Sequence, residues 1–229
     1  MVERLEILNS QTHRHVRMYA PRASYPHYVQ IFPEELATAG IYCPVFLSKD
    51  SNTGRFYIGA MFGLKPGELQ VDGADDGTAA LQPLDLQRQG FFTAGEHLAL
   101  NLDDARFADN APIALFDAAG EPSDELRAIQ HLIGRIVAGQ QASDAFIAAM
   151  LAIRAIEPIT ISLDFDDGDK LVLDGLYTIS LDALNELEDN AIAALFRQGY
   201  LQAALCIRQS QQLVGVLAQR RNQTLGLRL

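Results

Sequence analysis

Residues 159–178 read ITISLDFDDGDKLVLDGLYT, and this stretch decides the fold. Apolar side chains occupy every second position of its first run, which is the period of a strand with one face on a core. The Asp-rich segment DDGD then turns the chain, so the following run should return antiparallel to the first. We therefore expect a β-hairpin over residues 159–179, with Ile161, Leu163 and Phe165 facing a long helix that precedes it.

The first 120 residues favour short strands and loops. Residues 41–47 and 55–62 are rich in residues that prefer strands, and the segment between them, residues 49–54, contains the Asp, Asn and Gly of a turn. This arrangement predicts a hairpin. Phe91, Phe92 and residues 97–102 predict two further strands.

The apolar period changes to that of a helix after Pro122. Ser123 is suited to cap a helix whose apolar face begins at Leu126. Gly134 and Gly139 weaken its middle, so the pattern predicts either one long helix or two that join near Gly139. We expect Glu157-Pro158 to end this helical region. Shorter helices are predicted after Ser180, over residues 190–197 and over residues 200–220.

These patterns together predict an α+β fold, with N-terminal short antiparallel strands, a long central helix, a β-hairpin and C-terminal helices. The chain has 229 residues, of which 48% are hydrophobic and 21% charged, enough to bury a sizeable core. Neither a linker composition nor an internal repeat divides it. We expect a single domain over residues 1–229, and the alternative is a subdivision into a β-rich part, 1–120, and a helix-hairpin-helix part, 121–229.

The net charge of −11 is unevenly distributed along the chain. Residues 99–198 hold 18 acidic side chains against 6 basic ones, whereas residues 199–229 hold four arginines and no acid. The acidic middle repels phosphate backbones, which argues against a nucleic acid partner. We expect the C-terminal arginines to complement the acidic middle or a helix C-terminus.

The distribution of apolar residues bears on location. Glu3, Arg4 and Glu6 interrupt the apolar run that a secretory signal requires, and no apolar stretch approaches the ~20 residues of a membrane span. Cys43 and Cys206 both lie in apolar runs, which predicts buried, reduced thiols. We therefore expect a cytoplasmic protein without a membrane span, and a surface location only through export that needs no Sec signal.

Histidines near the N-terminus are candidate metal ligands. If residues 11–18 are extended, His13 and His15 point to the same side and could bind a metal together, with His27 as a distant third ligand. The alternative, which the short motif favours, is a set of exposed polar residues on an N-terminal arm.

The Asp-rich turn offers a second candidate metal site, because Asp164, Asp166 and Asp169 carry the oxygen ligands that Ca²⁺ prefers. Its spacing differs from that of an EF-hand, since Gly168 comes too early and Gly175 stands where the bidentate Glu belongs. A solvated hairpin turn is the favoured interpretation. No nucleotide-binding loop or nucleophile motif occurs, so no cofactor and no catalytic residue is indicated.

A series of short motifs follows a fixed order along the chain. In the C-terminal half these are Phe116-Asp-Ala-Ala-Gly-Glu-Pro122, Glu157-Pro158, Asp167-Gly168, Leu173-Asp-Gly-Leu-Tyr177 and Leu184-Asn-Glu-Leu187. The N-terminal half adds His13-Arg14, Tyr42-Cys-Pro-Val-Phe46 and Gly63-Leu-Lys-Pro-Gly67. Their order resembles the bacterial SapC family over nearly the whole chain. Residues 82–92 depart from the family, which usually has a Trp and an Arg pair there.

The resemblance implies a surface-layer-associated or accessory protein, and it carries over no catalytic residues. A transport label that some relatives bear does not suit a chain without a membrane span. We therefore expect a non-enzymatic binding or accessory protein with a protein partner, which includes a homodimer. A surface-layer component is the second hypothesis, and a metal-dependent enzyme that uses the N-terminal histidines is the third.

Overall fold

The structure is a computed structural model that describes residues 5–21, 25–73 and 79–226. Its helices and antiparallel sheets confirm the predicted α+β class. The chain forms two compact units: unit 1 comprises Met1–Ala23 and Leu84–Ala138, and unit 2 comprises Ser24–Pro83 and Gly139–Leu229. The chain thus runs from unit 1 to unit 2, returns, and crosses again within the long helix α3 (Asp124–Ala152).

Unit 1 is built on two small antiparallel sheets. The first has the order β1-β7-β6 and the second pairs β2 with β8. The bounds are β1 (Leu5–Ile7), β2 (Arg17–Met18), α2 (Leu84–Gln87), β6 (Phe91–Ala94), β7 (His97–Asn101) and β8 (Ile113–Ala114). The two strands predicted around residues 91–102 are confirmed as β6 and β7. Fully buried side chains form its core: Met18, Phe91, Leu100, Leu115 and Leu126.

A buried arginine ties the loops of unit 1 together. Arg106 is 2% exposed, and its guanidinium donates hydrogen bonds to the carbonyl oxygens of Tyr19 (3.1 Å), Gln87 (3.1 Å) and Gln89 (2.8 Å). Burial lowers the pKa of Arg106 to about 10, although the negative charge of Asp104 acts in the opposite direction and raises it. The side chain therefore remains a cation at neutral pH. It connects its own loop with Tyr19 and with residues 87–89.

Unit 2 contains a five-stranded antiparallel sheet with the order β3-β5-β4-β10-β9. Its strands are β3 (Tyr28–Gln30), β4 (Val45–Lys49), β5 (Phe56–Met61), β9 (Ile156–Asp164) and β10 (Lys170–Ile179). The pairs β4–β5 and β9–β10 confirm both predicted hairpins. Its helices are α1 (Leu36–Tyr42), α4 (Leu181–Asn185), α5 (Asp189–Arg197), α6 (Tyr200–Ser210) and α7 (Leu213–Gly226), with a 3-10 turn, η1 (Pro33–Glu35), before α1.

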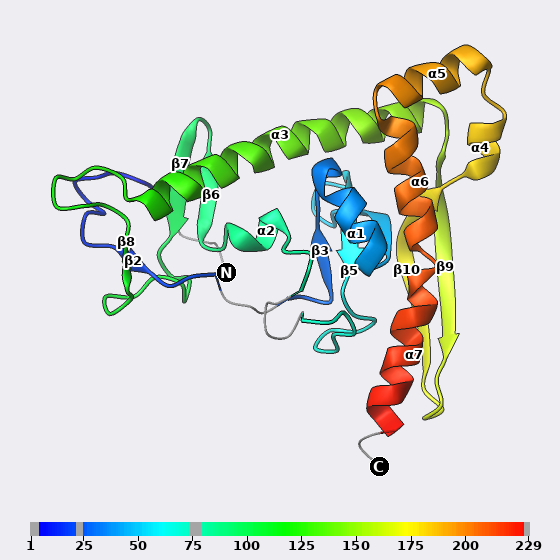
Figure 1. Cartoon of the computed structure of the whole chain (residues 1–229), viewed down its shortest axis with the longest axis horizontal. Coiled ribbons are helices and arrows are strands. Elements are labelled where there is room, and N and C mark those ends of the chain that lie inside the picture. Colours follow the sequence, from blue (N-terminus) through cyan, green and yellow to red (C-terminus); the bar gives the residue numbers. More distant parts are fainter. Residues whose placement is uncertain (1–4, 22–24, 74–78, 227–229) are drawn as a thin grey trace. The chain divides into compact units, whose positions relative to one another are not determined.

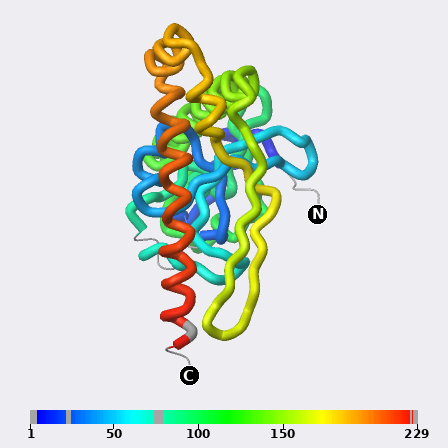
Figure 2. Tube along the Cα trace, turned by 90° about the vertical axis from the view of Figure 1, so that its right-hand side faces the viewer, coloured from blue at the N-terminus to red at the C-terminus, as the bar shows by residue number. Residues whose placement is uncertain are grey.

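The helices that cover the β9–β10 hairpin are α6 and α7, which run along it in both views (Figures 1 and 2). The prediction that the long helix covers this hairpin is wrong. Phe165 is buried beneath the guanidinium of Arg221 from α7, 3.9 Å from the ring centroid. The apolar positions predicted for this helical region are buried at Val214 and Leu217 in α7, as is Ile207 in α6. Both α3 and the C-terminal helices have an apolar face, and sequence periodicity alone does not predict which of them packs on the hairpin.

The motif Leu173-Asp-Gly-Leu-Tyr177 forms an irregularity in β10. The pairing register with β9 shifts between Leu173 and Leu176, and Gly175 has a φ of +70°. Such a backbone favours glycine, because a side chain is strained there. The motif thus encodes a bulge in the hairpin.

The long helix is continuous, which decides between the two predicted alternatives. Ser123 caps it as expected, with its hydroxyl accepting the N–H of Leu126 at 3.2 Å. Gly139 permits close packing, because a Cβ there would lie 2.7 Å from Cγ of Phe32. The helix ends at Ala152, before Glu157-Pro158, and a left-handed Arg154 (φ 55°) turns the chain into β9, to which the proline already belongs.

Two further boundaries differ from the sequence predictions. Residues 41–47 divide into the end of α1, where Ile41 is 70% exposed, and the start of β4, because Cys43 and Pro44 break the helix into extended backbone. The predicted helix over residues 200–220 is two helices, separated at Gln211 and Gln212. An apolar pattern runs through both breaks, so periodicity does not reveal them.

Candidate binding pocket

The N-terminal histidines lie in turns, and the extended stretch assumed for residues 11–18 is wrong up to Val16. His13 is buried, its Nδ1 accepts the N–H of Asn9 at 3.0 Å, and its Nε2 lies 3.4 Å from a carboxylate oxygen of Glu6. His15 is exposed in the same unit, and His27 is half-buried in unit 2. Among the residues that the structure describes, no three His, Cys, Asp or Glu side chains gather as a metal site.

We expect His13→Ala to lower the free energy of unfolding by about 1–3 kcal/mol, because it removes a buried imidazole together with the hydrogen bond that this ring accepts from the N–H of Asn9. Urea denaturation with and without EDTA measures this loss, which should be the same in both. His15→Ala is the matched control, and its exposed side chain should change stability by less than about 0.5 kcal/mol. A bound transition metal that both substitutions remove would instead support the metal-site hypothesis.

The Asp-rich turn faces a cation of the chain itself. Arg221, whose side chain is 6% exposed, pairs with Glu68 (3.0 Å) and Asp169 (2.9 Å) and lies 3.6 Å from Asp167. Lys65 adds a second ion pair with Asp169. We call these five residues the α7 clasp.

The prediction that the C-terminal arginines complement the acidic middle is confirmed for Arg221 alone. Arg220 pairs with Asp72, outside the acidic middle, Arg208 donates to Gln211, and Arg228 lies outside the described residues.

The other predicted calcium ligands point elsewhere. Asp164 pairs with Lys170 at 3.1 Å on the exposed side of the hairpin. Asp166 is exposed, and its backbone N–H donates to the side chain of Asn222. The three predicted ligands therefore have separate surroundings, and only Asp169 belongs to the α7 clasp.

The α7 clasp makes stability depend on pH. The hydrogen bond from Lys65, with the charges of Lys65 and Arg221, holds the pKa of Asp169 below its ordinary value of 3.8. A carboxylate with a lowered folded pKa stabilises the fold fully above its unfolded pKa, and this contribution is lost as the pH falls through the folded value. We expect Asp169→Asn to lower stability at pH 7 and to flatten its decline below about pH 4.

Urea denaturation midpoints between pH 2 and pH 7 test this expectation. Asp166→Asn is the control, because it removes a carboxylate of the same turn that lies outside the α7 clasp. Its profile should follow that of the unmodified chain. Parallel profiles for Asp169→Asn and the unmodified chain would contradict the expectation.

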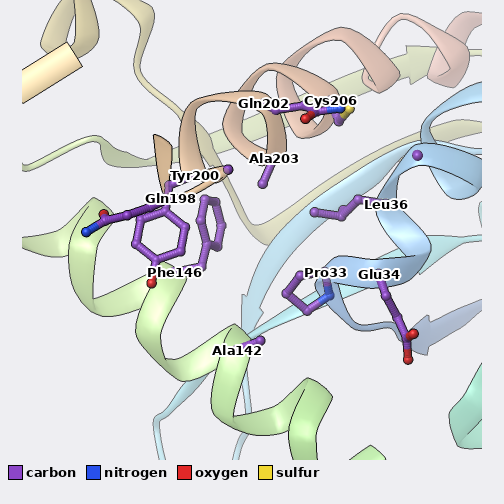
Figure 3. A pocket seen from close by; sticks show the side chains of 12 residues that line it. Pro33, Glu34, Leu36, Ala142, Phe146, Gln198, Tyr200, Gln202, Ala203 and Cys206 are labelled. Atoms are coloured by element: carbon purple, nitrogen blue, oxygen red, sulfur yellow. The ribbon is translucent and has the colours of Figure 1, made fainter. Parts of the chain in front are cut away.

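A pocket of about 540 Å³ opens in unit 2 between the second half of α3, the η1–α1 segment and the start of α6 (Figure 3). The lining side chains come from three distant stretches of sequence: Pro33, Glu34, Leu36, Ala37, Ala142, Phe146, Gln198, Gly199, Tyr200, Gln202, Ala203 and Cys206. Most of them are apolar or small, and the amides and the carboxylate supply polar groups. A mainly apolar pocket with a few polar groups is the usual form of a site for a small ligand.

An aromatic pair forms one end of the pocket. The rings of Phe146 and Tyr200 meet edge to face, with their centroids 5.9 Å apart. Gly199, with a φ of +76°, turns the chain from α5 into α6 and so places Gln198 and Tyr200 at this end. On the opposite walls Ala142 and Ala203 are short side chains, which leave the space open.

The two cysteines are free thiols in different surroundings. Cys43 is buried, and burial raises the pKa of its thiol to about 12. Cys206 is half-buried and lines the pocket. We expect one thiol of the folded protein to react with Ellman's reagent at pH 8, and a second only after unfolding. The variant Cys206→Ser should lose the fast thiol and Cys43→Ser should keep it, whereas the reverse order would contradict the assignment.

Sequence reasoning missed this pocket. Phe146, Ala203 and Cys206 lie at apolar positions of helices, and such positions are typical of a core. These residues form a pocket only because three segments pack together, and the residue spacing within any one segment does not predict this. The prediction of a buried thiol holds for Cys43 and is wrong for Cys206, which is half-buried in the pocket lining.

Comparison with known protein families gives a match over most of the chain. The family model named SapC matches residues 8–217. The protein belongs to the SapC family. The comparisons with curated proteins and with solved structures gave no match. None of the helices in the described residues is both long and apolar enough to cross a membrane.

The motifs that carry the SapC resemblance have structural positions. Phe116 bridges to Pro122 in the turn before α3, Gly175 forms the bulge of β10, and Gly63 lies against the backbone of Glu68. These three SapC motifs lie outside the pocket lining. These motifs have structural roles in turns and in the β-bulge. The function of the pocket therefore has to be inferred from the side chains that line it.

Proposed function

We propose that this SapC protein is a non-enzymatic binding or accessory protein, and that the pocket between α3, η1–α1 and α6 holds an apolar group of its ligand. The observation that carries the proposal is the pocket itself, about 540 Å³ with an aromatic pair at one end. Pockets for small ligands span roughly 300–1,000 Å³. Burial of an apolar group contributes about 25 cal/mol for each Å² removed from water, which favours binding at such a site.

A neutral apolar fluorophore, N-phenyl-1-naphthylamine, tests the proposal. We expect its fluorescence to rise on binding, and we expect the bound probe to slow alkylation of Cys206 by iodoacetamide. The second readout places the probe in the pocket, because Cys206 is part of the lining. Peptide mapping after alkylation separates Cys206 from the buried Cys43.

Two Phe substitutions on one helix supply a matched pair. Ala142→Phe fills the pocket and should weaken probe binding at least tenfold, whereas Ala148→Phe lies on an exposed part of α3 outside the lining and should not. Both positions are exposed, so neither change should disturb the core. Absence of binding, or equal effects of the two substitutions, would overturn the proposal.

For the location of the protein we propose the cytoplasm. Support comes from two free thiols, one of them fully buried, which suit a reducing compartment. Cell fractionation with antibody detection tests this proposal. Recovery of the protein from the cell surface would favour the surface-layer hypothesis.

A further inference from the structure

The two edges of the five-stranded sheet in unit 2 differ in length. The edge strand β3 has three residues, whereas β9 has nine and pairs, among the described strands, with β10 alone. Figure 1 shows β9 at the outer margin of unit 2, next to β10. A long edge strand presents a row of backbone N–H and C=O groups to which another strand can pair. The β9 edge is therefore a candidate interaction surface.

Hydrogen bonds at the two ends of β9 show which of its amides point outward. The carbonyl oxygen of Ala155 and the N–H of Phe165 both bond to residues that flank β10, at 2.8 and 3.0 Å. Amide directions alternate along a strand, so the odd-numbered residues of β9 face β10, and Thr160 and Ser162 direct their amides outward. Pro158 also has an outward position, where a residue without an N–H breaks no bond to β10.

The middle of β9 lacks the features that keep edge strands apart. Such features are charges and prolines, and in β9 they stand only at the ends, as Glu157-Pro158 and Asp164. The stretch between them, residues 159–163 (ITISL), is uncharged and consists mostly of residues that favour strands. Its three apolar side chains are half-buried, so a further strand at this edge would cover them more fully.

We propose that β9 pairs antiparallel with β9 of a second copy of this chain, which joins the two five-stranded sheets into one. Antiparallel pairing of identical strands is self-complementary about a two-fold axis, the commonest symmetry of protein dimers. Alignment of the apolar rows places Ile161 on the axis, opposite its own copy, and Ile159 opposite Leu163. Thr160 and Ser162 then exchange backbone hydrogen bonds across the interface, and no two like charges lie opposite each other.

Disulfide trapping tests both the partner and the register. In a Cys206→Ser background, Ile161→Cys should form a covalent dimer on mild oxidation. The reason is that opposite residues of a non-hydrogen-bonded pair lie about 4.5 Å apart between Cα atoms, within the range of a disulfide. Val172→Cys is the matched control, because it is exposed on β10, one strand further from the axis, and should remain monomeric. The remaining thiol, Cys43, is buried in both variants.

Sedimentation velocity over roughly 1–100 µM measures association of the unmodified chain, and we expect dimer to accumulate within this range. Ser162→Pro removes an outward N–H and should abolish the dimer, whereas Ser162→Ala keeps that N–H and should preserve it. The double variant Thr160→Lys/Ser162→Lys should also be monomeric, because it brings like charges together at the axis. Both side chains are exposed, so this variant tests the proposal even where the proline variant does not fold.

Three results would overturn the proposal. They are a monomer at every concentration, a dimer that both the proline and the double lysine variant retain, and equal cross-linking of Ile161→Cys and Val172→Cys. None of them bears on the pocket, whose lining, as far as the structure describes it, contains no residue of β9.

Discussion

Gly63→Ala is expected to lower the free energy of unfolding by about 4 kcal/mol, which is far above the usual effect of one added methyl group. A Cβ on Gly63 would overlap the carbonyl oxygen of Glu68 and lie 2.8 Å from its carbonyl carbon. Hydrogen bonds fix the backbone on both sides, from Gly63 N–H to His27 (3.0 Å) and from Gln70 N–H to Phe62 (2.9 Å). The chain therefore has little room to move away from the added atom.

Urea denaturation of Gly63→Ala and Gly67→Ala compares two glycines of one turn. Gly67 has a φ of +81° with no atom within 4 Å of its Cβ position, so its replacement adds only backbone strain, about 1 kcal/mol. Similar losses for the two variants would show that steric overlap at Gly63 is relieved by movement of the turn.

Arg106→Met is expected to lower the free energy of unfolding by about 3–5 kcal/mol, because it removes a buried guanidinium that donates to three carbonyl oxygens. Methionine fills much of the same volume, so the loss reports the missing hydrogen bonds more than a cavity. Arg106→Lys retains the charge but lacks the planar fork, and should recover only part of the stability.

Arg127→Met is the matched control for this prediction. Arg127 is half-exposed and pairs with Asp124 one turn away in α3, so its loss should cost less than about 0.5 kcal/mol. Thermal and urea denaturation measure both variants, and the near-ultraviolet circular dichroism should change only for Arg106→Met. Equal stabilities would show that the loops of unit 1 hold without the guanidinium.

The elements with strong local signals could be predicted from sequence. Alternation before the turn at Gly168 specifies the β9–β10 hairpin, and the Ser123 cap marks the start of α3. The boundary between α1 and β4 could not be located, because Ile41 and Tyr42 are apolar yet exposed on the helix. Their burial depends on tertiary neighbours, which local pattern does not contain.

For the candidate sites, too, the sequence predicts some features and not others. The sequence indicates His13 and the Asp-rich turn as candidate metal ligands, and in the structure their partners are side chains of the same chain: Glu6 for His13 and Arg221 for Asp169. Sequence reveals the group but not the partner, since Arg221 lies 52 positions from Asp169. The pocket forms only where α3, α1 and α6 pack together. The small residues that line it there have no sequence pattern that predicts this packing.

The alternation of the chain between its two units has a consequence for synthesis on the ribosome. Every segment of unit 1 has been made once residue 138 is translated, so this unit can fold early. The sheet of unit 2 has to wait, because its central strand β4 pairs with β10, which is made more than a hundred residues later. During that interval the nascent chain exposes an unpaired strand edge, the kind of surface that chaperones protect from aggregation. Helix α7 follows β10 in the chain, and its Arg221 can pack over Phe165 only after this delay.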